Sequence, residues 1–488
     1  EIDKERGVIL EEWRSRRNAQ WRMMTQMLPV MYEGSMYAKR DIIGDTAVIK
    51  NFDPETLRAF YHDWYRTDLQ AIAVVGDFNV DDVEAKIKTI FSPIPAIENP
   101  LSRPENLLTS REGTKYLLVT DPEAPRTEVG LMIIDREPDK RKRDLDYIRD
   151  GYVTSLMNNM MNNRFNEIVQ KGTPPFVAGG LSYSSDLPRN YNALTLAAYA
   201  NEGQEAKGFE AALTELERAR RHGFTQGELN RARAEMLSDF ENLYKQKDKI
   251  SNDEWASKIR DHFLTGEPLP SLDLQYDYYK KILPGITVKD VNSRQQELVK
   301  DDNRFVYVQG PDDREHMTEA EAMNIIAKVA EADIKPYEDI TGGTDLISEE
   351  LKAAEIVKTV TLPQFAATEW TLANGARVVF RHADYEKDNV SISGYAFGGS
   401  SFYPDSLEPA LNLFPQVTSM YGAGEFDNVA LTKMLAGKKA SVSLGLQETT
   451  QTVSGSSTPK DFETMMQLLY LRFARPNFNK EAYDAIIG

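Results

Sequence analysis

Cysteine is absent from this 488-residue sequence, and its absence removes three kinds of chemistry at once. Without a thiol the chain forms no disulfide, carries out no thiolate catalysis and offers no sulfur ligand to a metal. A chain without cysteine fits an oxidising compartment as well as a reducing one. The composition therefore leaves the compartment open.

Histidine is scarce and poorly spaced for metal binding. None of the five histidines forms His-x-x-Glu-His or His-x-x-x-His, the spacing that places two imidazoles on one helix face. Packing, a surface position or a place near a helix C-terminus explains each of them more simply. They therefore predict no metal site of their own. The five are His62, His222, His262, His316 and His382.

Long apolar runs and an excess of positive charge are also missing. No apolar stretch approaches the ~18 residues needed to cross a bilayer, so we expect no membrane span. The net charge is −18, whereas proteins that bind nucleic acid present a basic surface. A basic cluster at residues 140–143 is flanked by Asp139 and Asp144, which is typical of a solvated helix face. We therefore expect no nucleic-acid partner.

The opening residues 1–13 carry the most informative pattern that is present. They predict an amphipathic helix in which Glu5 and Glu12 are separated by six residues, among them the apolar residues 8–10. A helix turns about 100° per residue, so this spacing returns to within roughly 20° of the starting direction. Glu11 points away by about a quarter turn. Glu5 and Glu12 are therefore expected to share one face.

Two interpretations of this acidic face stay open from the spacing alone. Acidic residues are favoured near a helix N-terminus, so a solvated acidic face is the simpler one. Stacked carboxylates on one face can also supply a metal ligand together with a second carboxylate that orients it.

Several segments resemble one family. Residues 5–13 read Glu-Arg-Gly-Val-Ile-Leu-Glu-Glu-Trp and are followed by an arginine-rich stretch. Further motifs that resemble the same family are Tyr61-x-x-Trp64-Tyr65-Arg66, residues 71–77 and 375–380, and Gly398-Gly399-Ser400. Through these segments, spread over nearly the whole chain, the sequence resembles the bacterial pitrilysin/insulinase zinc peptidases, which are inverzincins.

The resemblance implies a zinc site. Members of this family hold zinc through the two histidines of a His-x-x-Glu-His helix and a glutamate from a later helix. That later ligand is the second of two glutamates separated by six residues, which corresponds to Glu12 here. Glu5 then corresponds to the supporting, catalytic carboxylate. The resemblance implies one zinc ion per intact molecule, which lowers the pKa of a bound water and polarises the scissile carbonyl.

The chain departs from the family because it contains no His-x-x-Glu-His. The family places that helix well before the third ligand, so we expect it upstream of residue 1 and interpret the chain as an internal fragment. A zinc site needs about three protein ligands and a water. The fragment alone is therefore expected to be inactive and not to retain zinc.

Internal repetition predicts the architecture. Residues 69–91 and 303–329 both read as a strand, a turn and a helix, and residues 478–488 resemble the start of the chain, with Glu481 matching Glu1 and Ala485 matching Glu5. The length is enough for roughly three domains. The resemblance implies an α+β fold of repeated two-layer units, each a mainly antiparallel sheet covered by helices.

We divide the chain accordingly into four parts. Residues 1–105 are expected to form the C-terminal part of a first, catalytic-type unit, and residues 106–335 a complete second, non-catalytic unit. Residues 336–358, with Gly342-Gly343 and scattered acids, predict a linker. Residues 359–488 are expected to form the N-terminal part of a third, non-catalytic unit.

The third unit lacks the metal-binding residues of the family. Where the family carries its zinc helix after the Gly-Gly-Ser segment, residues 408–415 contain no histidine, and Pro415 is expected to interrupt a regular helix.

Secondary structure is clearest in the second unit. The methionine- and asparagine-rich run at residues 157–163 is typical of core and helix surface rather than of a ligand site. The segment from Thr225 to Glu228 is a capping-box pattern. The expected strands are residues 115–120, 128–134, 176–185, 193–199 and 304–309, and the expected helices are residues 145–169, 208–221, 225–243 and 318–329; the third unit adds strands at 376–381 and 390–397.

The function implied by the resemblance is that of a zinc metalloendopeptidase that hydrolyses unfolded peptides inside an enclosed chamber. The alternative is a non-catalytic peptide-binding or partner subunit of such a peptidase, and a third interpretation is an acidic scaffold without peptide contacts. Strand edges near Gly179-Gly180 and Gly398-Gly399 are candidate peptide acceptors by strand addition.

Partners and compartment follow from the same resemblance. We expect peptide substrates, the missing N- and C-terminal portions of the polypeptide and a possible homo-oligomer. A bacterial periplasm or cell envelope is the compartment that the family implies, while the sequence itself leaves localisation unknown.

Overall fold

A computed structural model describes residues 1–488 apart from 137–141, 185–186, 188–189, 341–344, 481–482 and 485–488. Half of the basic cluster at 140–143, and the matching residues Glu481 and Ala485, therefore lie outside the described residues. The chain divides into two compact bodies. The large body comprises Glu1–Val169, Pro174–Leu229 and Lys249–Tyr337, and the small body Gln170–Thr173, Asn230–Asp248 and Glu338–Gly488.

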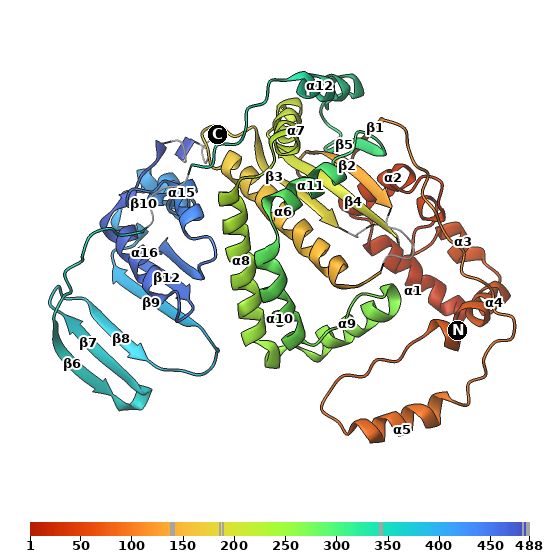
Figure 1. The fold of residues 1–488 in the computed structure, drawn as a ribbon, viewed down its shortest axis with the longest axis horizontal. Coiled ribbons are helices and arrows are strands. Elements are labelled where there is room, and N and C mark those ends of the chain that lie inside the picture. The colour runs from red at the N-terminus through yellow and green to blue at the C-terminus, as the bar shows by residue number, and fades with distance from the viewer. Residues whose placement is uncertain (137–141, 185–186, 188–189, 341–344, 481–482, 485–488) are drawn as a thin grey trace. The chain divides into compact units, whose positions relative to one another are not determined.

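A five-stranded sheet forms the centre of the large body (Figure 1). Its order is β1-β5-β2-β4-β3, with β1 and β5 parallel and every other pair antiparallel. The central strands are rich in β-branched and aromatic residues and bury both faces, as strands between two neighbours do. The strands are β1 (Thr114–Thr120), β2 (Glu128–Arg136), β3 (Phe176–Ser184), β4 (Tyr191–Ala200) and β5 (Arg304–Gly310).

Helices cover this sheet. Helix α6 (Leu145–Val169) packs against β3, and α7 (Glu205–His222) packs against β4 and α12 (Glu319–Glu331). Helix α11 (Val288–Leu298) contacts both α6 and α7. The methionines of the run at 157–163 are buried in this core, as predicted. The predicted α+β fold of a mainly antiparallel sheet covered by helices is confirmed.

A buried arginine joins three helices. Arg164 of α6 donates to both carboxylate oxygens of Glu228, at 2.6 and 2.9 Å, and to Glu215 of α7 at 3.2 Å. Glu228 lies in the first turn of α8 (Gln226–Lys245), where it also accepts from the Thr225 backbone N–H, so the predicted capping box is present. Arg164 is 2% exposed, and such a buried charge is tolerated because both acids pair with it.

The N-terminal residues of the large body are helical. Met23, Met27 and Met31 form the buried stripe of α2 and pack with Phe305 and Tyr307 of the sheet.

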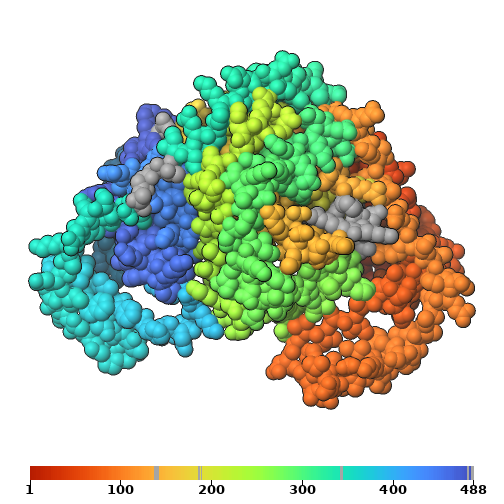
Figure 2. Space-filling model, viewed as in Figure 1, coloured from red at the N-terminus to blue at the C-terminus, as the bar shows by residue number. Residues whose placement is uncertain are grey.

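The remaining helices of the large body are exposed to varying degrees; α9, α10 and α11, coloured green, form one continuous surface (Figure 2). The bounds are α1 (Ile2–Ser15), α2 (Ala19–Met31), α3 (Thr46–Asn51), α4 (Pro54–Trp64), α5 (Val80–Phe91), α9 (Asn252–Thr265) and α10 (Leu272–Ile282).

The strand predicted around residues 71–75 is wrong. The backbone there forms no ladder, and Ile72 and Val74 are 47% and 46% exposed. A strand needs a neighbour for its N–H and C=O groups, and no strand of the described residues lies alongside this segment. The helix predicted to follow it is α5 (Val80–Phe91) and is confirmed.

The small body contains two three-stranded antiparallel sheets, ordered β6-β7-β8 and β11-β12-β9. Helix α16 (Phe462–Ala474) packs on β11 and β12. The helical turns α13 and α14 meet at Leu413, so the predicted interruption near Pro415 is confirmed. Strand β6 begins at Ile356, within the range predicted for the linker. The other bounds are β6 (Ile356–Leu362), β7 (Ala367–Leu372), β8 (Arg377–Arg381), β9 (Val390–Phe397), α13 (Glu408–Asn412), α14 (Phe414–Ser419), β10 (Gly422–Ala423), α15 (Asn428–Met434), β11 (Ala440–Leu446), β12 (Thr450–Ser457) and β13 (Pro476–Asn477).

Over the part of the chain that the structure describes, every helix is too short or too polar to cross a bilayer.

Candidate functional site

Glu5 and Glu12 both lie on α1, which is a continuous helix as predicted. The Glu5 side chain is exposed, and the Glu12 side chain is 41% exposed and pairs with Arg16 at 2.5 Å. The neighbouring Glu11 pairs instead with Arg14. The two predicted site residues therefore share one accessible helix, and their roles stay predictions.

The N-terminal half of α1 is held by an arginine. Arg6 donates to the backbone carbonyls of Ile49 and Phe52 at 2.6 and 2.8 Å, and its guanidinium lies 4.1 Å from the centre of the Phe52 ring. Those two carbonyls belong to the last residues of α3 and its C-terminal cap, where a cation is favoured. Arg6 thus joins α1 to α3 just beyond Glu5.

The C-terminal end of α1 is held by a stacked cation. The Arg17 guanidinium lies 4.2 Å from the Trp13 ring centre and 5.0 Å from that of Trp21, and the two indoles meet edge to face at 6.3 Å. An arginine between two indoles combines cation–π attraction with a large apolar contact. This cluster fixes the turn between α1 and α2, directly after Glu12.

A bidentate ion pair then joins α2 to the sheet. Arg22 donates to the two oxygens of Asp121 at 2.6 and 2.7 Å, and to Glu123 at 2.6 Å. Asp121 directly follows β1 and is buried. The hydrogen bonds from Arg22 lower the pKa of Asp121 to about 2, and the two acids raise the pKa of Arg22 above its usual value. Arg22 also donates to the Arg17 carbonyl. Contacts therefore run without a break from Arg17 through Arg22 to Asp121.

The residues present do not fit a zinc ion by themselves. Among the described residues no three histidine, aspartate or glutamate side chains gather in a way that could hold a metal ion. A zinc site needs about three protein ligands, and Glu12 offers one carboxylate that pairs with Arg16 in this structure. No reaction step through a metal follows from these residues.

Three of the histidines have structural partners. His316 lies 2.8 Å from a Glu205 oxygen, whose other oxygen accepts from a backbone N–H. His222 and His262 each lie within hydrogen-bonding distance of a backbone carbonyl. The pairing of His316 with Glu205 spans 111 positions, which local spacing could not predict.

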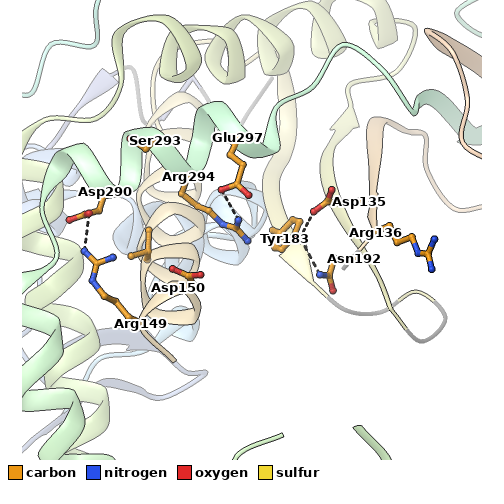
Figure 3. A pocket seen from close by; sticks show the side chains of 11 residues that line it. Asp135, Arg136, Arg149, Asp150, Tyr183, Asn192, Asp290, Ser293, Arg294 and Glu297 are labelled. Carbon is orange, nitrogen blue, oxygen red and sulfur yellow. Dashed lines mark hydrogen bonds and ion pairs between the residues drawn. The ribbon is translucent and has the colours of Figure 1, made fainter. Parts of the chain in front are cut away.

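A polar pocket of about 500 Å³ lies beside the ends of β2, β3 and β4 (Figure 3). At its centre the Tyr183 hydroxyl donates to Asp135 at 3.0 Å and accepts from Asn192 at 3.1 Å. Burial and, after it, the nearby Asp135 carboxylate raise the pKa of Tyr183 to about 12, so this hydroxyl stays protonated. Lys300 pairs with the second Asp135 oxygen at 2.6 Å.

The charges around this pocket are arranged in pairs. Arg149 of α6 pairs with Asp290 of α11 at 2.8 Å, and Arg294 pairs with Glu297 at 2.9 Å, as Figure 3 shows. Arg294 also donates to Thr154 at 3.1 Å, and its guanidinium lies 5.1 Å from the Tyr183 ring centre. These contacts fix the wall that the pocket shares with a larger cavity.

The larger cavity, of about 1310 Å³, is rich in tyrosine. It shares Asp150, Tyr183, Asn192 and Arg294 with the polar pocket. Its wall also includes residues of α6, α10, the α9–α10 connection and the segment before β1, together with Tyr37, Ser184, Leu187, Asn190 and Tyr191. Its tyrosines are Tyr37, Tyr147, Tyr152, Tyr183, Tyr191 and Tyr278.

The free edge of β3 is partly closed by α6. Asn162 accepts from the Leu181 N–H at 2.9 Å and donates to its carbonyl at 3.0 Å, and Asn158 accepts from the Tyr183 N–H at 3.2 Å. These amides bond the groups that a further strand needs, so strand addition is blocked there. Gly179 and Gly180 lie on this edge before the capped residues.

Sequence reasoning missed both the cavity and the amide cap. The cavity combines side chains from segments far apart in the chain, which no local pattern connects. One signal was available: Asn158 and Asn162 are four residues apart on a predicted helix, the spacing that places two side chains on one face.

Comparison with known proteins gives consistent matches. Residues 51–236 match the family described as the peptidase M16 inactive domain. A zinc protease PQQL-like protein of Arabidopsis thaliana is 27% identical over 452 residues, which cover 92% of this chain and 44% of that protein. The probable zinc protease PqqL of Escherichia coli is 24% identical over 494 residues, which cover 100% of this chain and 52% of that protein.

Solved structures share the fold. The periplasmic protease PqqL from Escherichia coli superposes with a TM-score of 0.65 at 22% identity, over 99% of this chain and 54% of that one. Pitrilysin superposes with a TM-score of 0.61 at 13% identity, over 99% of this chain and 51% of that one. The chain thus spans about half the length of the curated relatives it matches.

Proposed function

This chain belongs to the pitrilysin/insulinase family of peptidases, and we propose that the whole protein is a zinc-dependent metalloendopeptidase acting on unfolded peptides. In this proposal Glu12 supplies one zinc ligand and Glu5 steadies the ligand set. The other donors belong to a His-x-x-Glu-His helix outside these residues.

The observation that carries the proposal is that specific contacts hold α1 at both of its ends. No residue of α1 is buried, so this helix owes little of its position to core packing. Polar and cation–π contacts nevertheless hold it at both ends, through Arg6 and through Arg17. A helix that presents a ligand needs such a fixed position, because a metal site tolerates little error in its geometry.

The remaining parts of the chain have non-catalytic roles in this proposal. Residues 106–335 and 359–488 would form walls of an enclosed chamber that admits unfolded peptides, and residues 336–358 would connect them. Since a relative with this fold is named a periplasmic protease, we propose the bacterial periplasm or cell envelope as the compartment.

Metal analysis of the full-length protein tests the proposal. We expect Glu12→Gln to abolish zinc retention, because a carboxylate ligand becomes a neutral amide. Glu11→Gln is the matched control, since it removes a neighbouring exposed acid from another direction of the same helix. Stoichiometric zinc in Glu12→Gln protein contradicts the assignment.

A non-catalytic peptide-binding or partner subunit is the second candidate. The description of the matching family as an inactive domain favours it. The coding sequence upstream of residue 1 separates the two. A His-x-x-Glu-His there supports the peptidase, and its absence supports the subunit.

A further inference from the structure

The hairpin of β7 and β8 (Figure 1) contains the one Asn-Gly pair of the sequence, Asn374-Gly375. Both residues are exposed, and a Cβ built on Gly375 would have nothing within 4 Å. The glycine has a φ of +87°, which is why this residue type suits the turn. Because glycine has no side chain, nothing crowds the backbone nitrogen that follows Asn374.

A hydrogen bond folds the Asn374 carboxamide over the next peptide unit. The Ala376 N–H donates to Asn374 Oδ1 at 3.1 Å. The ring of atoms that this bond closes contains both the Asn374 side-chain carbon Cγ and the Gly375 nitrogen. The carboxamide is therefore kept beside that nitrogen. The Ala376 N–H also faces the oxygen on which negative charge develops when a nucleophile adds to Cγ, and such a donor stabilises that charge.

Backbone hydrogen bonds close the same turn. The Gly375 N–H donates to the Leu372 carbonyl at 2.9 Å, and the Leu372 N–H donates to the Ala376 carbonyl at 2.8 Å. A reaction at the Gly375 nitrogen removes its proton and with it the first of these bonds. The net contribution of one such bond corresponds to a rate roughly two- to tenfold lower than in an unfolded chain. The turn therefore slows such a reaction without preventing it.

We propose that Asn374 is a site of spontaneous covalent modification, at which the chain converts asparagine to aspartate and isoaspartate without an enzyme. The Gly375 nitrogen bonds to Asn374 Cγ and loses its proton, while the Cγ–Nδ2 bond breaks and ammonia leaves. Water then adds to one of the two carbonyls of the five-membered imide. Opening at one carbonyl gives aspartate, and opening at the other gives isoaspartate, whose main chain runs through the former side chain.

The modification changes the hairpin in charge and in length. Either product adds one negative charge at the turn, and isoaspartate also adds one CH₂ group to the main chain. The turn sets the register of β7 and β8, in which Trp370 lies opposite Val378. Since a longer main chain does not fit the bonds that close the turn, isoaspartate is expected to loosen the pairing of β7 with β8. The separate β11-β12-β9 sheet should stay unchanged.

A second exposed asparagine, Asn389, is a control within the same chain. The residue that follows it is Val390, whose branched side chain crowds the backbone nitrogen. The Asn389 amide also donates to Glu386 and Ser391. We therefore expect Asn389 to stay unmodified under conditions that convert Asn374.

Peptide mapping of the full 488-residue chain tests the proposal. The chain is held in mildly alkaline buffer at body temperature, sampled over time and digested with trypsin. The tryptic peptide from Thr359 to Arg377 contains Asn374 as its only asparagine. Mass spectrometry detects the replacement of the amide NH₂ by OH, and electron-transfer fragmentation separates isoaspartate from aspartate. A parallel sample is unfolded in guanidinium chloride.

Two variants separate the reaction from its consequence. Asn374→Gln moves the carboxamide one CH₂ further from the Gly375 nitrogen, so we expect conversion at least about tenfold slower than in the wild-type chain. Asn374→Asp carries the charge of the product without the longer main chain. Hydrogen exchange at the β7 and β8 amides should be faster in the aged wild-type chain than in fresh Asn374→Asp chain.

Three outcomes overturn the proposal. An Asn374 that stays intact in the folded chain, or that converts far more than about tenfold faster once the chain is unfolded, shows that the hairpin protects the residue. Conversion of Asn389 at the same rate shows that exposure alone controls the reaction. Equal rates for the wild-type and Asn374→Gln chains exclude the imide. The proposal stands independently of the proposed peptidase activity.

Discussion

Arg22 and Asp121 form a bidentate ion pair across 99 positions of sequence, with both contacts at 2.7 Å or less. The pair is one of the contacts through which α2, the helix that follows α1, meets the central sheet, because Asp121 follows β1 and Arg22 lies on α2. Planar, doubly bonded pairs of this type fix orientation as well as distance. The position of α1 therefore depends on a contact far from both glutamates.

Removing this pair should loosen the N-terminal helices. We expect Asp121→Asn to lower the melting temperature, because the amide cannot accept two charge-assisted hydrogen bonds from Arg22. Differential scanning calorimetry measures the shift. Glu123→Gln is the control, since Glu123 is an exposed second partner of the same arginine and its loss leaves the bidentate contact intact. A larger effect for Glu123→Gln than for Asp121→Asn contradicts this role.

Acid is expected to destabilise the fold by protonating Asp121. The pKa of Asp121 is about 2 in the folded chain, below its ordinary value of 3.8, because Arg22 hydrogen-bonds its charged form. A depressed folded pKa contributes stability above the unfolded pKa and loses it as the pH falls. The contribution should therefore disappear between about pH 4 and pH 2. Thermal unfolding over this range should show a shallower pH dependence for Asp121→Asn, and an unchanged slope would refute the assignment.

The buried network around Arg164 should dominate the stability of the large body. Arg164→Met leaves Glu215 and Glu228 buried without their shared cation, so we expect a loss of about 3–5 kcal/mol in the free energy of unfolding. Urea denaturation followed by circular dichroism gives the value. Arg220→Met should cost less than about 1 kcal/mol, because Arg220 is more exposed and its partner Glu217 keeps Arg221. Similar losses in both variants would argue against the network.

The amide cap on β3 should be visible in hydrogen exchange. Asn162→Ala leaves the Leu181 N–H and C=O without their partner, so we expect faster exchange at Leu181 and a loss of about 1–3 kcal/mol. Asn163→Ala is the neighbouring control, since Asn163 donates to the Asn159 side chain. Unchanged protection of Leu181 in Asn162→Ala would show that the backbone groups are satisfied in another way.

Local patterns were sufficient for the elements that depend on local forces. The sequence predicts α6 over residues 145–169 and β9 over residues 390–397, which are the bounds in the structure. Hydrophobic periodicity and capping residues act within one element, so one stretch of chain contains the information. The Thr225–Glu228 capping box is another such case.

Features that depend on residues far apart in the sequence could not be predicted from local patterns. Residues 71–75 have the composition of a strand, but a strand forms only where a neighbouring strand completes its hydrogen bonds. The ion pair of Arg22 with Asp121 and the tyrosine cavity join segments whose proximity is set by the sheet order. For Glu12 the sequence predicts a role, and the structure supplies the contacts that hold its helix in place.

The most direct test of the central claim is zinc-edge anomalous diffraction from crystals of the full-length protein. We predict a zinc peak within about 2.0–2.2 Å of a Glu12 carboxylate oxygen, with Arg16 displaced from that oxygen. A zinc ion coordinated without Glu12, or a Glu12 carboxylate that still pairs with Arg16 while the metal is bound elsewhere, would contradict it.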